Sequence, residues 1–385
     1  MRDFRSERVR RIPPSGIRKF FDIAQEMDDV ISLGVGEPDY DTPWNVREAA
    51  ISSIEKGYTA YTSNSGLNEL RNEISGYQKE RFGVDYSPEN EILITTGASE
   101  ALDITIRTVV NPGDEVLVAE PAYIAYCSGV ILSGGVPVYV PCPAKENFRL
   151  TPDSLMEKIT PKSKALLCNF PNNPSGGVMT VDDYRAIADI VVDHDLLLIS
   201  DEIYNEITYE GMPSSAACVE ELRERTVIIN GFSKAYSMTG WRIGYICAPQ
   251  EIAAAALKIH QYVMLSAPTM SQYAAVEAVK NGWDARNEMV REYNIRRNLF
   301  VNGMRRAGLE CHMPKGAIYA FPSVESTGLS DEEFAERLLK EKHIAVVPGS
   351  IFGPSGTNHL RCCYAISRDN LVTAIERIEE FVNEL

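Results

Sequence analysis

Residues 230–244 read N-G-F-S-K-A-Y-S-M-T-G-W-R-I-G and contain a single lysine, Lys234. An apolar run at residues 226–229 precedes this stretch and predicts a buried strand, and a second strand is predicted over residues 242–248. Large apolar and aromatic side chains crowd the lysine at the end of the first strand. Because burial disfavours the charged ammonium, we expect the pKa of Lys234 to fall and its neutral amine to act as a nucleophile toward carbonyl compounds.

A second motif, L-L-L-I-S-D-E-I-Y at residues 196–204, carries a carboxylate to the same region. Its unbroken apolar run predicts a parallel strand buried on both faces, and Asp201 stands at the carboxyl end, where ligands bind in open α/β sheets. Asp201, Lys234 and Arg242 are the groups that pyridoxal phosphate requires. They supply a partner for the pyridinium, an amine for the imine and an anchor for the phosphate.

The order of the predicted elements indicates an α/β protein. From residue 91 onward short apolar strands alternate with helices, which predicts a mainly parallel sheet with helices on both faces. After about Tyr293 the pattern changes to an α+β mixture, which predicts a smaller unit. A helix capped by Ser15 is expected to run to about Met27. The strands of the large sheet are predicted at residues 92–95, 115–119, 136–140, 165–169, 196–200 and 227–230.

The first of these strands leads through Gly97, Ala98 and Ser99 into an apolar-periodic helix at residues 101–109. Unpaired backbone N–H groups and the positive end of the helix dipole make such an N-terminus suited to phosphate. An ordinary serine-capped helix is the alternative on this motif alone. An arginine at position 242 directed at the same phosphate favours the anion site.

Composition narrows the class of protein further. The 385 residues hold 38 Lys and Arg against 54 Asp and Glu, a formal net charge of −16, which disfavours binding to nucleic acid. Charged residues interrupt the longest apolar stretches, so no membrane span is expected. The eight cysteines lack C-x-x-C spacing and the five histidines lack ligand spacing. We therefore expect reduced thiols in the cytoplasm and no metal site.

Over nearly its full length the chain resembles the class I (fold-type I) pyridoxal-phosphate aminotransferases, in their aspartate and aromatic branch. The resemblance implies a large cofactor-binding domain at residues 45–292 and a small domain built from both chain ends, residues 1–44 with an N-terminal arm and residues 293–385. Six motifs in order carry it: G-E-P-D-Y-D-T-P at 36–43, T-G-A-S-E-A at 96–101, N-P-S-G at 173–176, S-D-E-I-Y at 200–204, S-K-A-Y-S-M-T-G-W-R-I-G at 233–244 and L-R-C-C-Y-A at 360–365.

The resemblance assigns the groups around the cofactor ring. Lys234 would form the imine and then move a proton between the substrate α-carbon and the cofactor, and Asp201 would keep the pyridine nitrogen protonated. Tyr204 and Asn173 match positions that bind the phenolic oxygen. Tyr123 matches the aromatic residue that stacks on the ring, and both Asn173 and Tyr123 are also expected to border the substrate.

The resemblance also assigns the residues that bind the two anionic groups, the cofactor phosphate and the substrate α-carboxylate. Arg242, Ala98 and Ser99 would bind the cofactor phosphate, joined by Tyr61 from a partner subunit, which implies a homodimer with shared active sites. Arg361 would bind the substrate α-carboxylate through its planar fork.

Two glycines also bear on the site. Gly36 would let the substrate lie against the backbone. Gly231 is a departure, because many relatives have a phosphate-binding serine at this position. Ser233 is the residue expected to compensate.

The expected activity is ping-pong transfer of an amino group from an L-amino acid to 2-oxoglutarate. Aspartate is the first choice of donor. Aromatic amino acids, alanine and an acylated diamino acid stay open, because some bacterial aspartate enzymes of this branch carry a lysine where this chain has Ser99. A pyridoxal-phosphate lyase and a regulatory cofactor-binding module are the alternatives outside the aminotransferases.

Overall fold

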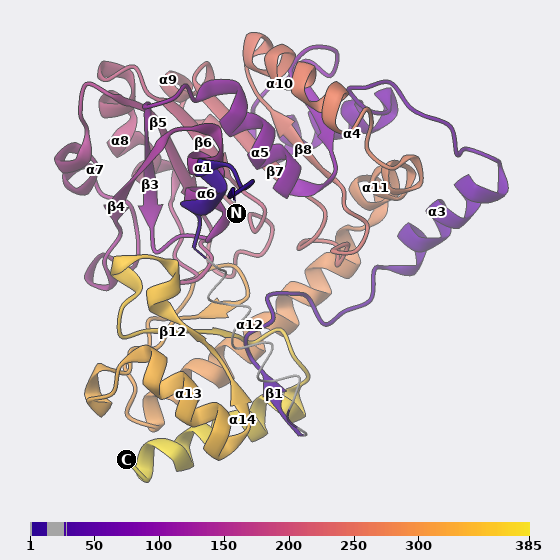
Figure 1. Cartoon of the computed structure of the whole chain (residues 1–385). Coiled ribbons are helices and arrows are strands. Elements are labelled where there is room, and N and C mark those ends of the chain that lie inside the picture. The colour runs from indigo at the N-terminus through magenta and orange to yellow at the C-terminus, as the bar shows by residue number, and fades with distance from the viewer. Residues whose placement is uncertain (1, 14–26, 28) are drawn as a thin grey trace.

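A computed structural model describes residues 2–13, 27 and 29–385, so nearly all of the helix predicted from Ser15 to Met27 lies outside the described residues. A seven-stranded sheet forms the centre of the larger part of the molecule (Figure 1). In spatial order its strands are β2 (Ile92–Thr95), β8 (Gly244–Cys247), β7 (Thr226–Gly231), β6 (Leu197–Asp201), β5 (Ser163–Asn169), β3 (Glu115–Glu120) and β4 (Val136–Pro141).

Strand direction brings the functional segments together. β8 pairs antiparallel with β2 and β7, and the other pairs are parallel, which confirms the predicted mainly parallel sheet. The carboxyl ends of β2, β3, β5, β6 and β7 therefore share one edge. Arg242 does not begin the predicted second strand. It lies two residues before β8 with a positive φ of 52°, so it belongs to the turn at this edge.

Helices cover both faces of the sheet, because apolar side chains of the strands point to both faces and must be buried. Val116 and Val118 pack in the core formed with α5 (Gly97–Val109), α6 (Ala125–Ser133) and α10 (Gln250–Val263). Leu117 and Ala119 point to the other face. Each fully buried aliphatic side chain contributes about 1.5–3 kcal/mol. The other face carries α7 (Pro152–Lys158), α8 (Val181–Asp193), α4 (Asn68–Phe82) and α11 (Thr269–Asn281).

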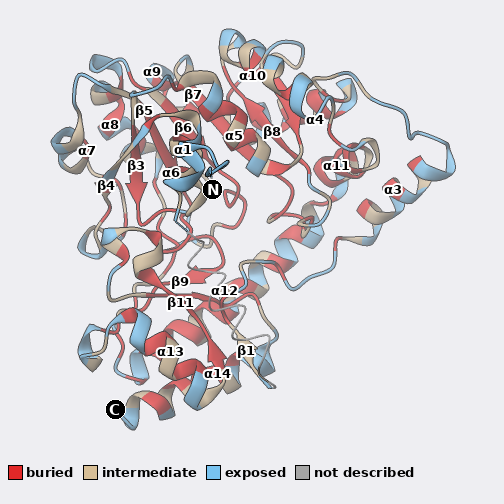
Figure 2. Ribbon diagram, in the orientation of Figure 1, coloured by how far each residue is buried: buried red, intermediate tan, exposed pale blue. Residues whose placement is uncertain are grey.

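The smaller part has its own buried core (Figure 2). The apolar run at residues 344–348 forms two strands, because β10 (Ile344–Ala345) pairs parallel with β1 (Ile31–Ser32) whereas β11 (Val347–Pro348) pairs antiparallel with β12 (Leu360–Cys363). β12 in turn pairs with β9 (Tyr319–Ala320). The remaining bounds are α12 (Trp283–Arg306), α13 (Asp331–Lys342) and α14 (Arg368–Asn383).

We propose that both chain ends build the smaller unit, because β1 pairs with β10. The boundary expected at residue 293 falls inside α12, which leads from the large sheet into the smaller part (Figure 1). The start of the chain, at residues 2–13, contacts the large part instead. Its helix α1 (Glu7–Arg10) lies against α6, and Arg8 donates to the Leu132 carbonyl over 3.1 Å.

Two short helices complete the large part. α3 (Trp44–Glu55) packs on α11 and protrudes from the body (Figure 1), and α9 (Glu220–Arg223) precedes β7. None of the described helices combines the length and apolarity needed to cross a membrane.

Candidate active site

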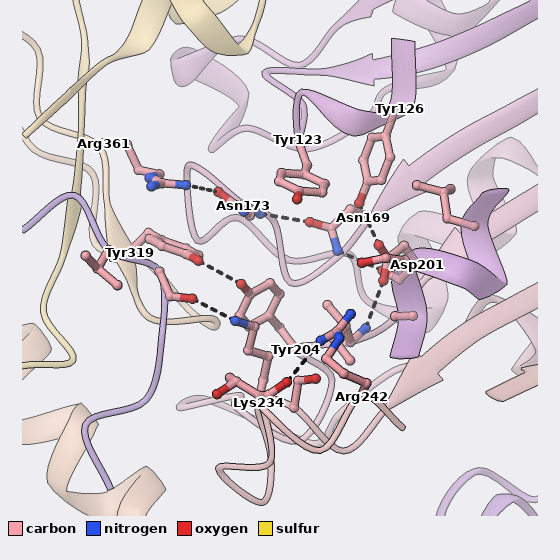
Figure 3. A pocket seen from close by; sticks show the side chains of 18 of the residues that line it. Tyr123, Tyr126, Asn169, Asn173, Asp201, Tyr204, Lys234, Arg242, Tyr319 and Arg361 are labelled. Atoms are coloured by element: carbon pink, nitrogen blue, oxygen red, sulfur yellow. Dashed lines mark hydrogen bonds between the residues drawn. The ribbon is translucent and has the colours of Figure 1, made fainter. Parts of the chain in front are cut away.

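A cavity of about 420 Å³ opens at the carboxyl edge of the sheet, between the large and small parts. All the predicted site residues except Tyr61 line it (Figure 3). The structure thus brings together, from seven separate segments of the chain, the residues Gly36, Ala98, Ser99, Tyr123, Asn173, Asp201, Tyr204, Lys234, Arg242 and Arg361.

Lys234 lies in the turn that follows β7, and its ammonium donates a 2.7 Å hydrogen bond to the Gly36 carbonyl. Burial lowers the pKa of Lys234 to about 8, which confirms the expectation from the crowded sequence around it. At pH 7 a group with this pKa is neutral in roughly a tenth of the molecules, against well under a thousandth for an unperturbed lysine. The amine is therefore available as a nucleophile near neutral pH.

Asp201 ends β6 and is buried at the floor of the cavity (Figure 3). One carboxylate oxygen accepts from the Tyr126 hydroxyl at 2.7 Å, and the other accepts from the Ile203 N–H at 3.1 Å. Burial raises the pKa of Asp201 to about 6, and the Tyr126 bond opposes this rise. Among the described residues no Lys or Arg forms an ion pair with it. A buried carboxylate of this kind favours a cationic ligand.

The phosphate-binding residues meet where α5 begins. The Arg242 guanidinium is held by the Thr239 carbonyl at 3.0 Å and lies beside the first turn of α5. A Cβ at Gly97 would lie 2.7 Å from its Nη2 atom, and the φ of +79° also requires glycine there. Ser233, expected to compensate for Gly231, lines the cavity as well. Together these groups place a guanidinium beside the N–H donors of a helix N-terminus, a combination that is suited to a phosphate.

Arg361 enters the cavity from β12 in the smaller part. It donates to the Gly34 carbonyl at 2.6 Å and to the Asn173 side-chain oxygen at 3.2 Å, and its Nε atom is buried without a partner among the described residues. The rings of Tyr319 and Phe352 flank its guanidinium at 4.9 and 5.0 Å. The arginine is thus fixed in direction and retains free donors for an anion.

Tyr204 and Tyr123 lie where a planar ligand would fit. The Tyr204 hydroxyl is buried, and its oxygen lies 2.7 Å from that of Tyr319. Tyr123 is 37% exposed and packs edge-on against Tyr126 at 5.7 Å between ring centres. Tyr61 does not reach the cavity of its own chain and is 81% exposed.

Three residues of this site were missed in the sequence. Tyr126 bonds Asp201, Asn169 donates to the Asp201 carbonyl at 2.8 Å, and Tyr319 bonds Tyr204. Asn169 did carry a signal, since it ends an apolar strand as Asp201 does, and the two residues are paired in the sheet. The sequence around Tyr126 and Tyr319 carried no comparable signal.

Comparison with known proteins identifies the family. A family model described as aminotransferase class I and II matches residues 28–378. The chain is 50% identical to the putative aminotransferase YugH of Bacillus subtilis, over 100% of both chains. It is 41% identical to aromatic-amino-acid aminotransferase 2 of Thermococcus litoralis, over 98% of each. The solved aspartate aminotransferase of Thermus thermophilus with maleate gives a TM-score of 0.93 at 38% identity, with 100% of both chains covered.

The chain therefore belongs to the class I and II aminotransferase family and is an aminotransferase that uses pyridoxal 5′-phosphate. The relatives named above are all aminotransferases, which favours this activity over the lyase and regulatory alternatives. The cavity also fits this cofactor chemically. Asp201 is a buried carboxylate with no ion-pair partner among the described residues, Arg242 stands at a helix N-terminus, and Lys234, whose pKa is lowered, lines the same cavity.

Proposed function

We propose that the donor is an L-amino acid with an uncharged side chain, aromatic or alanine, and that the acceptor is a 2-oxoacid. One observation carries this choice. Among the described residues that line the cavity, the cationic side chains are Lys234, Arg242 and Arg361. Each has a proposed partner already: the cofactor carbonyl carbon, the phosphate and the α-carboxylate. A second carboxylate on the substrate would meet no further cation from the described lining of this chain and would lose its hydration in part.

Aspartate, the first choice from the sequence, becomes the second candidate. It is supported by the 38% identity to the Thermus enzyme, which was solved with maleate, a dicarboxylate. The acceptor expected from the sequence, 2-oxoglutarate, also has a second carboxylate. An experiment on substrates must therefore vary donor and acceptor independently.

The chemistry divides between the cofactor and the chain. Pyridoxal phosphate, when bound, supplies an electron-withdrawing ring that stabilises negative charge at the substrate α-carbon. Arg361 binds the α-carboxylate in two parallel hydrogen bonds and so directs the α-hydrogen. Lys234, whose pKa of about 8 suits a base near neutral pH, takes that proton and returns it. Asp201 holds the proton on the ring nitrogen.

The remaining residues of the site bind and orient the cofactor and the substrate. Arg242, the Ala98 N–H and the Ser99 hydroxyl hold the phosphate, and Tyr204 and Asn173 donate to the phenolic oxygen. The ring of Tyr123 stacks on the cofactor and excludes water from one face. The backbone at Gly36 borders the substrate, and no side chain fits there because a Cβ would overlap the Tyr319 hydroxyl.

The functional unit is a two-fold homodimer in which Tyr61 reaches the phosphate of the partner's site. Tyr61 has no role in the cavity of its own chain. Large apolar residues nearby in the chain are also exposed, which favours a covered surface: Trp44, Ile51, Ile54 and Tyr58 are 61%, 45%, 55% and 47% exposed. The cytoplasm is the proposed location.

The test is a donor screen with purified protein. Alanine, phenylalanine, tyrosine, aspartate and an acylated diamino acid are each paired with 2-oxoglutarate, and all except alanine are also paired with pyruvate, because alanine and pyruvate exchange without net change. The value of kcat/KM is measured for every pair. We expect an uncharged donor to exceed aspartate at least tenfold, about 1.4 kcal/mol of transition-state binding. If aspartate is the best donor with both acceptors, the inference that the site has no cation for a second substrate carboxylate is wrong.

A further inference from the structure

Two buried tyrosine hydroxyls from different parts of the molecule meet at the cavity wall. Tyr204 follows β6 of the large sheet, and Tyr319 lies in β9 of the smaller part. Their oxygens are 2.7 Å apart, and the side chains are 4% and 1% exposed (Figure 3). No other described residue forms a hydrogen bond with either hydroxyl, so each depends on the other or on a ligand.

Tyr319 also borders the site proposed for the substrate carboxylate. Its ring centre lies 4.9 Å from the Arg361 guanidinium carbon, a cation–π contact. Burial raises the pKa of Tyr319 to about 12, and the Arg361 charge opposes that rise. A nearby positive charge makes a phenol a better hydrogen-bond donor. The Arg361 charge opposes the rise in the pKa of Tyr204 as well, but burial leaves the pKa of Tyr204 further above its usual value, so Tyr319 is the better proton donor of the pair.

The direction of the Tyr204–Tyr319 bond decides what Tyr204 is able to do. A hydroxyl has one hydrogen to donate. If Tyr204 donated it to Tyr319, Tyr204 would offer only lone pairs to the cavity, and these would repel an anionic phenolic oxygen. If Tyr319 donates to Tyr204, the Tyr204 hydrogen is left free to point into the cavity, and the two bonds reinforce each other.

We propose that Tyr319 is a positioning residue for the reaction: its hydroxyl donates to Tyr204 and thereby directs the Tyr204 hydrogen to the cofactor's phenolic oxygen. The inference rests on the proposed role of Tyr204 and extends it across the boundary between the large and small parts. It assigns a function to a residue of β9 that touches neither the cofactor phosphate nor the ring nitrogen site.

The experiment compares Tyr319→Phe, Tyr204→Phe and the double variant, each loaded with pyridoxal phosphate. The readout is the pH midpoint of the visible absorbance change. A hydrogen bond to the phenolic oxygen favours its charged form, so its loss raises the midpoint. We expect Tyr319→Phe to raise the midpoint by about 0.5–1 pH unit, the effect of one neutral hydrogen bond. The double variant should match Tyr204→Phe, because Tyr319 acts through Tyr204.

Tyr364→Phe is the matched control. Tyr364 is another fully buried tyrosine of the smaller part, and its hydroxyl donates to that of Tyr209 at 3.1 Å, outside the cavity lining. The Tyr364→Phe variant should lose thermal stability as Tyr319→Phe does, yet keep the wild-type pH midpoint of the absorbance change.

Four results would overturn the proposal. An unchanged midpoint in Tyr319→Phe does so, as does an equal shift in Tyr364→Phe, and so do additive shifts in the double variant. An unchanged midpoint in Tyr204→Phe would overturn it together with the role of Tyr204. None of these outcomes alters the result of the donor screen, so failure here is distinguishable from failure of the proposed substrate class.

Discussion

Replacing Arg361 by lysine retains the positive charge but removes the planar fork. The side chain is 4% exposed, and two of the five guanidinium N–H donors bond Gly34 and Asn173, which leaves three donors for a ligand. A lysine in this space is able to make one of the two parallel bonds to a carboxylate. Losing one charge-assisted hydrogen bond costs about 1.5–3 kcal/mol, so binding should weaken about 10- to 150-fold.

The assay follows each half-reaction by cofactor absorbance under single-turnover conditions. Because every amino acid and oxoacid carries the α-carboxylate, Arg361→Lys should raise the apparent Kd of all of them by a similar factor. Arg297→Lys is the control, since Arg297 is equally buried, bonds the Pro314 carbonyl at 2.8 Å and lies outside the cavity lining. A loss confined to one substrate, or an equal loss in Arg297→Lys, would refute the assignment of Arg361.

Three further predictions concern the cofactor. Asp201→Asn should retain pyridoxal phosphate but lose roughly a hundredfold in single-turnover rate, and a change in KM alone would contradict the role of Asp201. In cofactor-free protein the rate of cofactor attachment should rise with pH up to about 8 and then level off, because the lowered pKa of Lys234 makes its amine neutral above that pH; a rate still climbing near pH 10 would indicate an unperturbed lysine. Lys234→Ala and Tyr61→Ala should each be weakly active, and mixed dimers should regain activity, because one site then carries both intact residues. If Tyr61 acts within its own chain, mixing restores nothing.

Much of the large sheet could be predicted from the sequence because its strands are short apolar runs between turn signals. The run before Asp201 is buried as expected, and the pKa of Lys234 falls for the predicted reason, burial by its neighbours. The strands of the smaller part were less predictable. Residues 344–348 form one apolar run, yet the partners of β10 and β11 belong to different sheets, and no local pattern specifies a distant partner.

Tyr126 and Tyr319 were missed for the same reason, because a local sequence pattern does not specify a partner that is distant in the chain. Tyr126 lies 75 positions from Asp201, and Tyr319 lies 115 positions from Tyr204, so only the folded chain shows that their hydroxyls meet. A tyrosine in an apolar segment is more often a core residue, and both are buried like one.

The measurement that tests the site most directly is borohydride reduction of the cofactor-loaded protein, followed by proteolysis and mass spectrometry. Reduction fixes pyridoxal phosphate to the amine that holds it. We predict that the phosphopyridoxyl group is found on Lys234, and that prior addition of an L-amino acid without oxoacid prevents the labelling, because the cofactor has then left the lysine with the donor's amino group. A label on another lysine, or labelling that an amino-acid donor does not prevent, would contradict the account.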